Sequence, residues 1–163
     1  LSFTSGIDDT YDSYVFKFYN IHPATDNVQF LFNMSSDSGS NYNVTKTTTY
    51  FLAEHNATGG SANLSYQSAK DLAQSTDFQK LMTDLGNAAD ENLSGYLTIY
   101  NPSSTTFAKH FMSRTNAQAY SATNISFDNY IAGYGNTTSA VDAIQFKMSS
   151  GNFDGVIKLY GVS

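Results

Sequence analysis

Short segments of alternating hydrophobic and polar residues run through most of the chain, and turn residues separate them. In residues 14–21, Tyr14, Phe16 and Phe18 would share one face of an extended segment, and Lys17 would lie on the other. Because side chains alternate between the two faces of a β-strand, this pattern predicts a half-buried strand. Similar patterns predict strands over residues 28–34, 45–52, 96–100, 107–113, 125–132, 141–148 and 156–160.

Two of these segments, far apart in the chain, have matching patterns. Residues 30–36 read FLFNMSS and residues 144–150 read IQFKMSS. In each, apolar side chains stand two residues apart and the run ends in two serines, as in a strand that enters a turn. The match is too short to indicate a duplicated domain, so it predicts two strands with similar neighbours.

The connections between the segments are predicted from their turn residues. Pro23, Asp26 and Asn27 predict a turn after the first strand, and residues 28–34 are expected to return beside it as a hairpin.

One segment has helical spacing. Its apolar residues fall three and four positions apart, Thr76 and Gln79 have the spacing of a capping box, and Gly86 is a typical helix end. These features predict one short helix near residues 76–86. The apolar residues are Phe78, Leu81, Met82 and Leu85.

About eight or nine short strands with Gly, Asn, Pro and Ser turns favour an all-β fold. We expect an antiparallel β-sandwich of jelly-roll type, with the short helix inserted, as a single domain over residues 1–163. Composition supports this expectation, because Ser, Thr and Asn make up 53 of 163 residues and weaken helices, while aromatic residues reach 15%. There is no cysteine, which excludes disulfides, thiolate metal sites and cysteine nucleophiles.

Charge and hydropathy limit the expected partners. Fourteen acidic and eight basic residues give a net charge of −6, and the lysines are scattered along the sequence, so nucleic acid is not an expected partner. No apolar stretch approaches the ~20 residues that span a bilayer, so membrane insertion is not expected either. The chain begins at Leu1, as a processed product or a fragment of a longer protein would.

Catalytic motifs are not evident, and we expect no catalytic residues and no enzymatic activity. His22, His55 and His110 lie in different segments without metal-ligand spacing, and no Gly-x-Ser-x-Gly motif is present. Glu54 and Glu91 stand in dissimilar contexts, although aspartates could still supply a carboxylate pair for glycoside cleavage. A polysaccharide-degrading enzyme is therefore the least favoured alternative.

Two loops combine tyrosine with amide or carboxylate side chains, which suits sugar recognition, since a ring covers the apolar face of a sugar and polar groups bind its hydroxyls. Tyrosines at strand ends also serve the core, so both interpretations stay open. The glycan-contact candidates are Asp37, Asn41, Tyr42 and Asn43 in the first loop and Tyr134 and Asn136 in the second.

A calcium site is a further candidate. Asp8, Asp9 and Asp12 place three carboxylates within five residues, and carboxylate oxygens are the ligands that calcium prefers. Solvated turn residues explain the same pattern, and no other cofactor is expected.

Several strings resemble structural proteins of marine tailed bacteriophages, especially cyanophages, and together they span nearly the whole chain. They are YVFKFYNIHP at 14–23, KTTTY at 46–50, DLAQST at 71–76, NPSSTT at 101–106, TSAVDAIQFKMSS at 138–150 and IKLYGV at 157–162.

This resemblance implies a non-enzymatic virion component of a fibre, tail, neck or capsid surface, located at the surface of the extracellular particle. It implies contacts with other virion proteins and with copies of itself, in oligomers that include trimers. The alternative is a receptor-recognition module of a tail fibre that binds host-surface polysaccharide.

Overall fold

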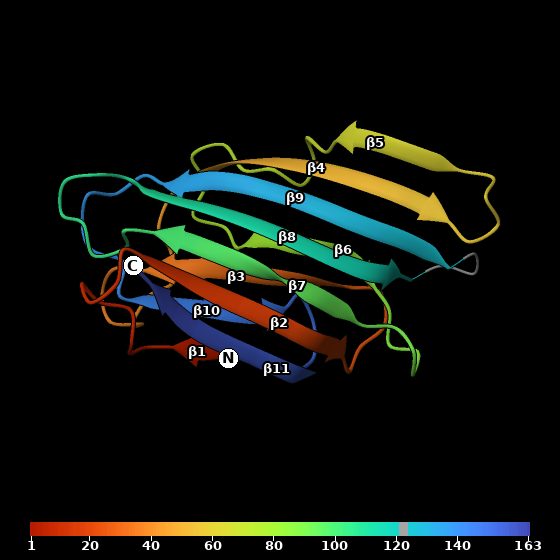
Figure 1. The fold of residues 1–163 in the computed structure, drawn as a ribbon, viewed down its shortest axis with the longest axis horizontal. Helices are drawn as coiled ribbons and strands as arrows, with labels where there is room; N and C mark the ends of the chain where they lie inside the picture. The colour runs from red at the N-terminus through yellow and green to blue at the C-terminus, as the bar shows by residue number, and fades with distance from the viewer. Residues whose placement is uncertain (121–123) are drawn as a thin grey trace.

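The computed structural model describes residues 1–120 and 124–163, which form eleven β-strands and no helix (Figure 1). The predicted all-β class is therefore confirmed. The strands are β1 (Ser2–Phe3), β2 (Ser13–Pro23), β3 (Val28–Ser35), β4 (Lys46–Asn56), β5 (Ala62–Tyr66), β6 (Gln79–Leu85), β7 (Leu93–Tyr100), β8 (Lys109–Ala119), β9 (Ile125–Gly135), β10 (Ala143–Met148) and β11 (Phe153–Val162).

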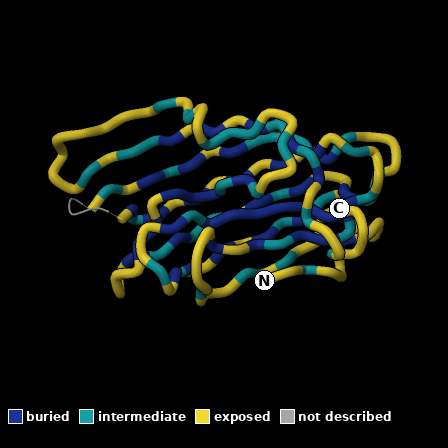
Figure 2. Tube along the Cα trace, turned by 180° about the vertical axis from the view of Figure 1, so that it is seen from behind, coloured by how far each residue is buried: buried dark blue, intermediate teal, exposed yellow. Residues whose placement is uncertain are grey.

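The strands form two layers, as in a β-sandwich (Figure 1). The front layer has the order β5-β4-β9-β8-β7-β2-β11, and the back layer has the order β1-β10-β3-β6. All strand pairs are antiparallel, and the pair Leu85–Ala119 of β6 and β8 joins the two layers into one hydrogen-bonded network. Buried residues lie between the layers, and exposed residues gather in the loops and on the outer faces (Figure 2).

Strand pairing is nested about the middle of the chain. β2 pairs with β11, β3 with β10, β4 with β9 and β7 with β8. The two matching sequence segments are thus direct neighbours: Phe32 pairs with Phe146, and Met34 with Ile144. Their shared pattern reflects one common environment, since both strands turn the same kind of side chain toward the same core.

A cluster of phenylalanines holds the layers together. Phe146 of β10 is fully buried, and its ring centroid lies 5.2 Å from those of Phe16 and Phe18, which come from β2 in the opposite layer. It also packs against Phe30 and Phe32 of the neighbouring strand, at 5.9 and 6.4 Å. Edge-to-face and offset contacts between such rings add to the stability that burial alone provides.

The expected hairpin between the first two strands is wrong. β2 belongs to the front layer and β3 to the back layer, so the turn at residues 24–27 carries the chain from one layer to the other. Phe18 and Phe30 consequently pack ring against ring across the core, at 5.3 Å.

The helix expected near residues 76–86 is also wrong, because this segment contains strand β6. Phe30 of β3 pairs with Met82 and Leu31 pairs with Lys80, so Leu81 is an extra residue in a β-bulge. Leu81 and Met82 are both fully buried. The bulge breaks the alternation of the strand and gives its apolar residues the three-and-four spacing that indicates a helix. None of the described residues lies in a helix that could cross a membrane.

Polar side chains are buried where β3, β4 and β6 approach one another. The ammonium of Lys46 is fully buried and donates to Asn33 Oδ1 at 2.6 Å and to the carbonyl oxygen of Val44 at 2.7 Å. Burial lowers the pKa of Lys46 from 10.5 to about 8, while the Asp77 carboxylate acts in the opposite direction. Thr48 and Gln79 bond to each other at 2.6 Å in the same region, so these buried groups are satisfied.

Replacing Phe146 by alanine should strongly destabilise the protein. Loss of a fully buried ring with five aromatic neighbours should lower the free energy of unfolding by about 3–5 kcal/mol. Chemical denaturation measures this difference. Phe107→Ala is the control, because Phe107 is 67% exposed, and its effect should stay within about 0.5 kcal/mol.

The buried amine of Lys46 predicts a pH dependence of stability. Between about pH 8 and pH 10.5 the unfolded chain holds a proton that the folded chain has released, so the free energy of unfolding should rise with pH. The contribution is at most about 3 kcal/mol. In urea titrations, the stability difference between the native chain and Lys46→Met should grow across this window. Lys147→Met, at an exposed position, controls for the lost charge; a flat difference would mean that Lys46 keeps its proton throughout.

Candidate functional site

A row of seven exposed side chains crosses the outer face of the front layer, one from each strand. Each is the cross-strand partner of the next, so the row runs perpendicular to the strands, over roughly 29 Å for six strand spacings. We call it the front-face row, and it contains four aromatic rings and three cations. From β11 to β5 its members are Lys158, Lys17, Tyr96, Arg114, Tyr130, Phe51 and Tyr66.

The centre of the row is held by Arg114. Its Nε and Nη2 donate to the two carboxylate oxygens of Asp128 at 3.0 and 2.7 Å, and its guanidinium carbon lies 4.8 Å from the centroid of Tyr130. Tyr130 also donates to Asp128, at 3.0 Å. The hydrogen bonds that Arg114 donates to Asp128 raise the pKa of Arg114 and lower the pKa of Asp128. This charged group is therefore rigid, with polar atoms beside exposed rings.

The β11 end of the row carries two lysines without carboxylate partners. Lys17 and Lys158 are directly opposed across β2 and β11, and within the described part of the chain neither makes an ion pair within 4.0 Å. Each ammonium lies over a tyrosine ring instead: Lys17 is 5.3 Å from the centroid of Tyr160, and Lys158 is 5.5 Å from that of Tyr19. Because Tyr160 pairs with Val15 and Tyr19 pairs with Val156, the two ammonium groups lie on opposite sides of the lysine pair.

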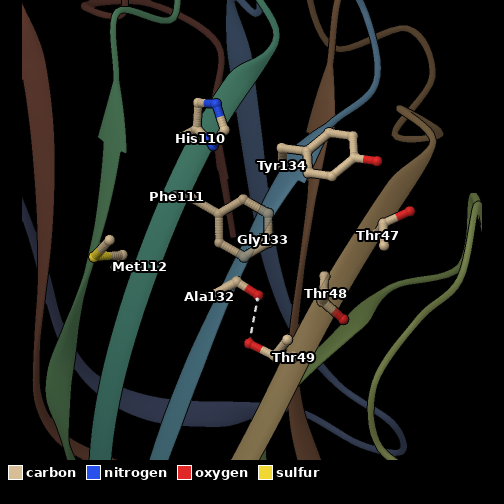
Figure 3. A pocket seen from close by; sticks show the side chains of 9 residues that line it. All are labelled: Thr47, Thr48, Thr49, His110, Phe111, Met112, Ala132, Gly133 and Tyr134. Carbon is tan, nitrogen blue, oxygen red and sulfur yellow. Dashed lines mark hydrogen bonds between the residues drawn. The ribbon is translucent and has the colours of Figure 1, made fainter.

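A groove lies beside the row, over β4, β9 and β8 (Figure 3). It has a volume of about 260 Å³ and continues into a second depression of about 320 Å³ that reaches Tyr96, Arg114 and Tyr130. The groove forms where the small side chain of Ala132 lies between Tyr130 and Tyr134 on the same face of β9.

Gly133 forms part of the groove floor, and no larger residue fits there. A Cβ atom on Gly133 would lie 2.6 Å from the carbonyl oxygen of Thr47 and 3.0 Å from Phe111 Cζ. Phe111 is buried, and its ring lies next to Gly133 (Figure 3). Because Gly133 has no side chain, the ring of Phe111 and the backbone of β4 can lie close to the backbone of β9 at the groove.

The second predicted glycan loop reaches this groove. Tyr134 lines it, and Asn136 follows at the end of β9. Asn136 Nδ2 donates to Gln74 Oε1 at 2.9 Å, and Gln74 Nε2 donates to Thr47 Oγ1 at 2.7 Å. The ring of His110 lies 6.1 Å from that of Tyr134 on the neighbouring strand. One end of the groove therefore offers amides, hydroxyls and an imidazole.

The first predicted glycan loop is largely bonded to itself. Asp37 accepts hydrogen bonds from Ser35, from the Asn41 amide at 2.8 Å and from the Asn41 backbone at 2.8 Å, which lower the pKa of Asp37 to about 2. The hydroxyl of Tyr42 is buried and has no hydrogen-bond partner among the described residues, while Asn43 is exposed. The structure thus gives Asp37 and Asn41 a role in shaping their own loop.

The predicted calcium candidates lie in the loop before β2. The Asp8 carboxylate accepts from the Tyr14 hydroxyl at 2.7 Å and from the Thr10 backbone at 2.9 Å, and the bond from Tyr14 lowers the pKa of Asp8. Asp9 and Asp12 are exposed. In residues 1–120 and 124–163, no three His, Cys, Asp or Glu side chains gather into a group that could hold a metal ion.

Sequence reasoning missed the front-face row. Each member is the polar or outward position of an alternating strand, and strand order decides which of these positions become neighbours. The signal present in the sequence was an aromatic residue at the outward position of four strands: Phe51, Tyr66, Tyr96 and Tyr130.

No protein-family model matches the chain, and no curated protein or solved structure matches it either.

Calcium should leave the thermal stability unchanged. Asp8 is already bonded to Tyr14 and Thr10, so a bound ion would have to replace these contacts. Thermal unfolding in excess calcium and in excess chelator should give the same midpoint. A midpoint that rises by several degrees with calcium, and loses this rise in Asp9→Asn, would instead support a site at Asp8, Asp9 and Asp12.

Proposed function

We propose that the protein is a non-enzymatic structural component of a tailed-bacteriophage virion, exposed at the particle surface, and that it acts through assembly contacts. The resemblance of its sequence strings supports the virion assignment, and an uncovered sheet edge supports the mode of action.

This edge is β11, which ends the front layer on the side opposite to β5. It is ten residues long, it pairs only with β2, and none of its residues is buried. Val156, Tyr160 and Val162 are 48, 42 and 46% exposed. A long edge strand with apolar side chains is a template for another strand, which would continue the sheet into a neighbouring molecule. We assign the assembly contact to this edge, with a second copy or another virion protein.

The proposal includes a sandwich of jelly-roll type. In that fold the chain resembles a long hairpin that is folded over. The first strand pairs with the last, and the second strand pairs with the last but one. The nested pairs β2–β11, β3–β10, β4–β9 and β7–β8 support this topology.

A second candidate function is receptor recognition by glycan binding, and the groove favours it. Tyr134 lines one end, Tyr96 and Tyr130 line the other, and the amide group around Asn136 provides hydrogen-bond donors and acceptors. Aromatic rings beside such polar groups are the typical composition of a sugar-binding surface.

Lysines on β11 should disrupt self-assembly. Val156→Lys combined with Val162→Lys places charges along the edge, which opposes strand addition. Light scattering after size exclusion should show oligomers of the native chain and monomers of the double variant. A stable contact should bury more than roughly 1,000 Å².

The matched control adds the same two charges at the exposed loop between β4 and β5, as Ala57→Lys with Thr58→Lys, and should keep the native oligomer. The chain should also be present in purified particles of the phage that encodes it, as measured by mass spectrometry. Absence from the particles would contradict the virion assignment, and a native chain that stays monomeric at all concentrations would contradict assembly through copies of itself.

A further inference from the structure

We propose that the front-face row binds an anionic polysaccharide, a chain whose sugars carry carboxylate or sulfate groups. This inference rests on the glycan-binding alternative above and deepens it by naming the ligand class and by placing the contacts on the sheet face.

Charge complementarity is the first argument. The protein has a net charge of −6, yet three of its eight basic residues stand in one exposed row. The row itself holds no acidic residue, and Asp128 is already engaged by Arg114. Lys17 and Lys158 therefore give this face two positive charges that no carboxylate among the described residues offsets.

The opposed lysines are the second argument. Lys17 and Lys158 are cross-strand partners whose ammonium groups lie on opposite sides of the pair, that of Lys17 over Tyr160 and that of Lys158 over Tyr19, and among the described residues neither has a carboxylate partner. The rings of Tyr160 and Tyr19 hold the ammonium groups in place. Carboxylate or sulfate groups of a bound chain would supply the ion partners that these two ammonium groups lack among the described residues.

The aromatic part of the row supplies the third argument. Tyr96, Tyr130 and Phe51 are 43, 41 and 43% exposed, and strand pairing fixes their spacing at about 4.8 Å per strand. Exposed rings in a fixed line fit the apolar C–H faces of successive sugars. The bidentate pair of Arg114 and Asp128 lies between the rings, where sugar hydroxyls would meet both a donor and an acceptor.

Single-stranded nucleic acid also combines negative charge with stacking surfaces. It carries a charge at every nucleotide, and the two lysines that are free of carboxylate partners among the described residues neutralise few of them on a protein of net charge −6. The observations therefore favour a saccharide chain of lower charge density, and the experiment includes an oligonucleotide as a separate arm.

The experiment measures binding of the full chain at low and moderate salt by isothermal titration calorimetry. The probes are polyuronate, dextran sulfate, neutral dextran and oligothymidylate. We expect at least one of the two anionic polysaccharides to bind, more weakly as salt increases, and to bind more tightly than dextran or oligothymidylate. The two anionic probes distinguish carboxylate from sulfate as the recognised group.

Two variants test the residues. Lys17→Gln with Lys158→Gln should weaken anionic binding about tenfold, since two ion contacts are lost, while the thermal midpoint stays near that of the native chain because both lysines are exposed. Tyr96→Ala should also weaken binding. The matched controls are Lys147→Gln in the back layer and Phe107→Ala in an exposed loop, and both should bind as the native chain does.

Each other outcome overturns the inference. Binding of neither anionic polysaccharide, or anionic binding unchanged by the double lysine variant, rejects the row as the site. Tighter binding of oligothymidylate assigns the face to nucleic acid. Binding of dextran alone, lost in Tyr134→Ala, would reject an anionic ligand while leaving the glycan-binding alternative intact. The assembly proposal is tested separately, by the oligomeric state of the β11 variants.

Discussion

The fold depends on the contact of phenylalanine rings between the two layers. Phe16 and Phe18 from the front layer close on Phe146 from the back layer, and Phe32 meets Phe111 in the same way at 4.9 Å. Rings of this size set the separation of the layers and leave little room for rearrangement, because protein interiors are close-packed. The positions of the strands, and with them the outward side chains, follow from this core.

A core of this kind leaves the outer faces free to carry function. In the front layer every second residue points inward to the rings, so the outward residues contribute little to the core and can be selected for contacts. The front-face row shows the result, since its seven members follow strand register and none is buried. The inner face of the sheet thus provides stability, and the outer face is left free for the contacts proposed above.

The sequence predicted the all-β class and most strands, because alternation is a local signal. It failed at Leu81 and Met82, where a bulge places two consecutive buried residues on one strand and imitates a helix. It failed again at residues 24–27, because the same turn residues permit a hairpin and a crossing between layers. The matching sequences of β3 and β10 predicted similar neighbours for the two strands, but nothing local in the sequence indicated that these strands pair with each other.

The candidate site was harder to predict for a related reason. Tyr134 was proposed because Gly133, Gly135 and Asn136 beside it predicted a loop, although it lies in β9, whereas Lys17 and Arg114 are unremarkable positions in two other strands. Strand register determines that these side chains become neighbours on one face. A shift of one residue in any pairing would turn the affected side chains to the opposite face and break the row. The same core contacts that fix the layers therefore also fix the register, and the arrangement of charge and rings on the front face is a consequence of packing on the inner face.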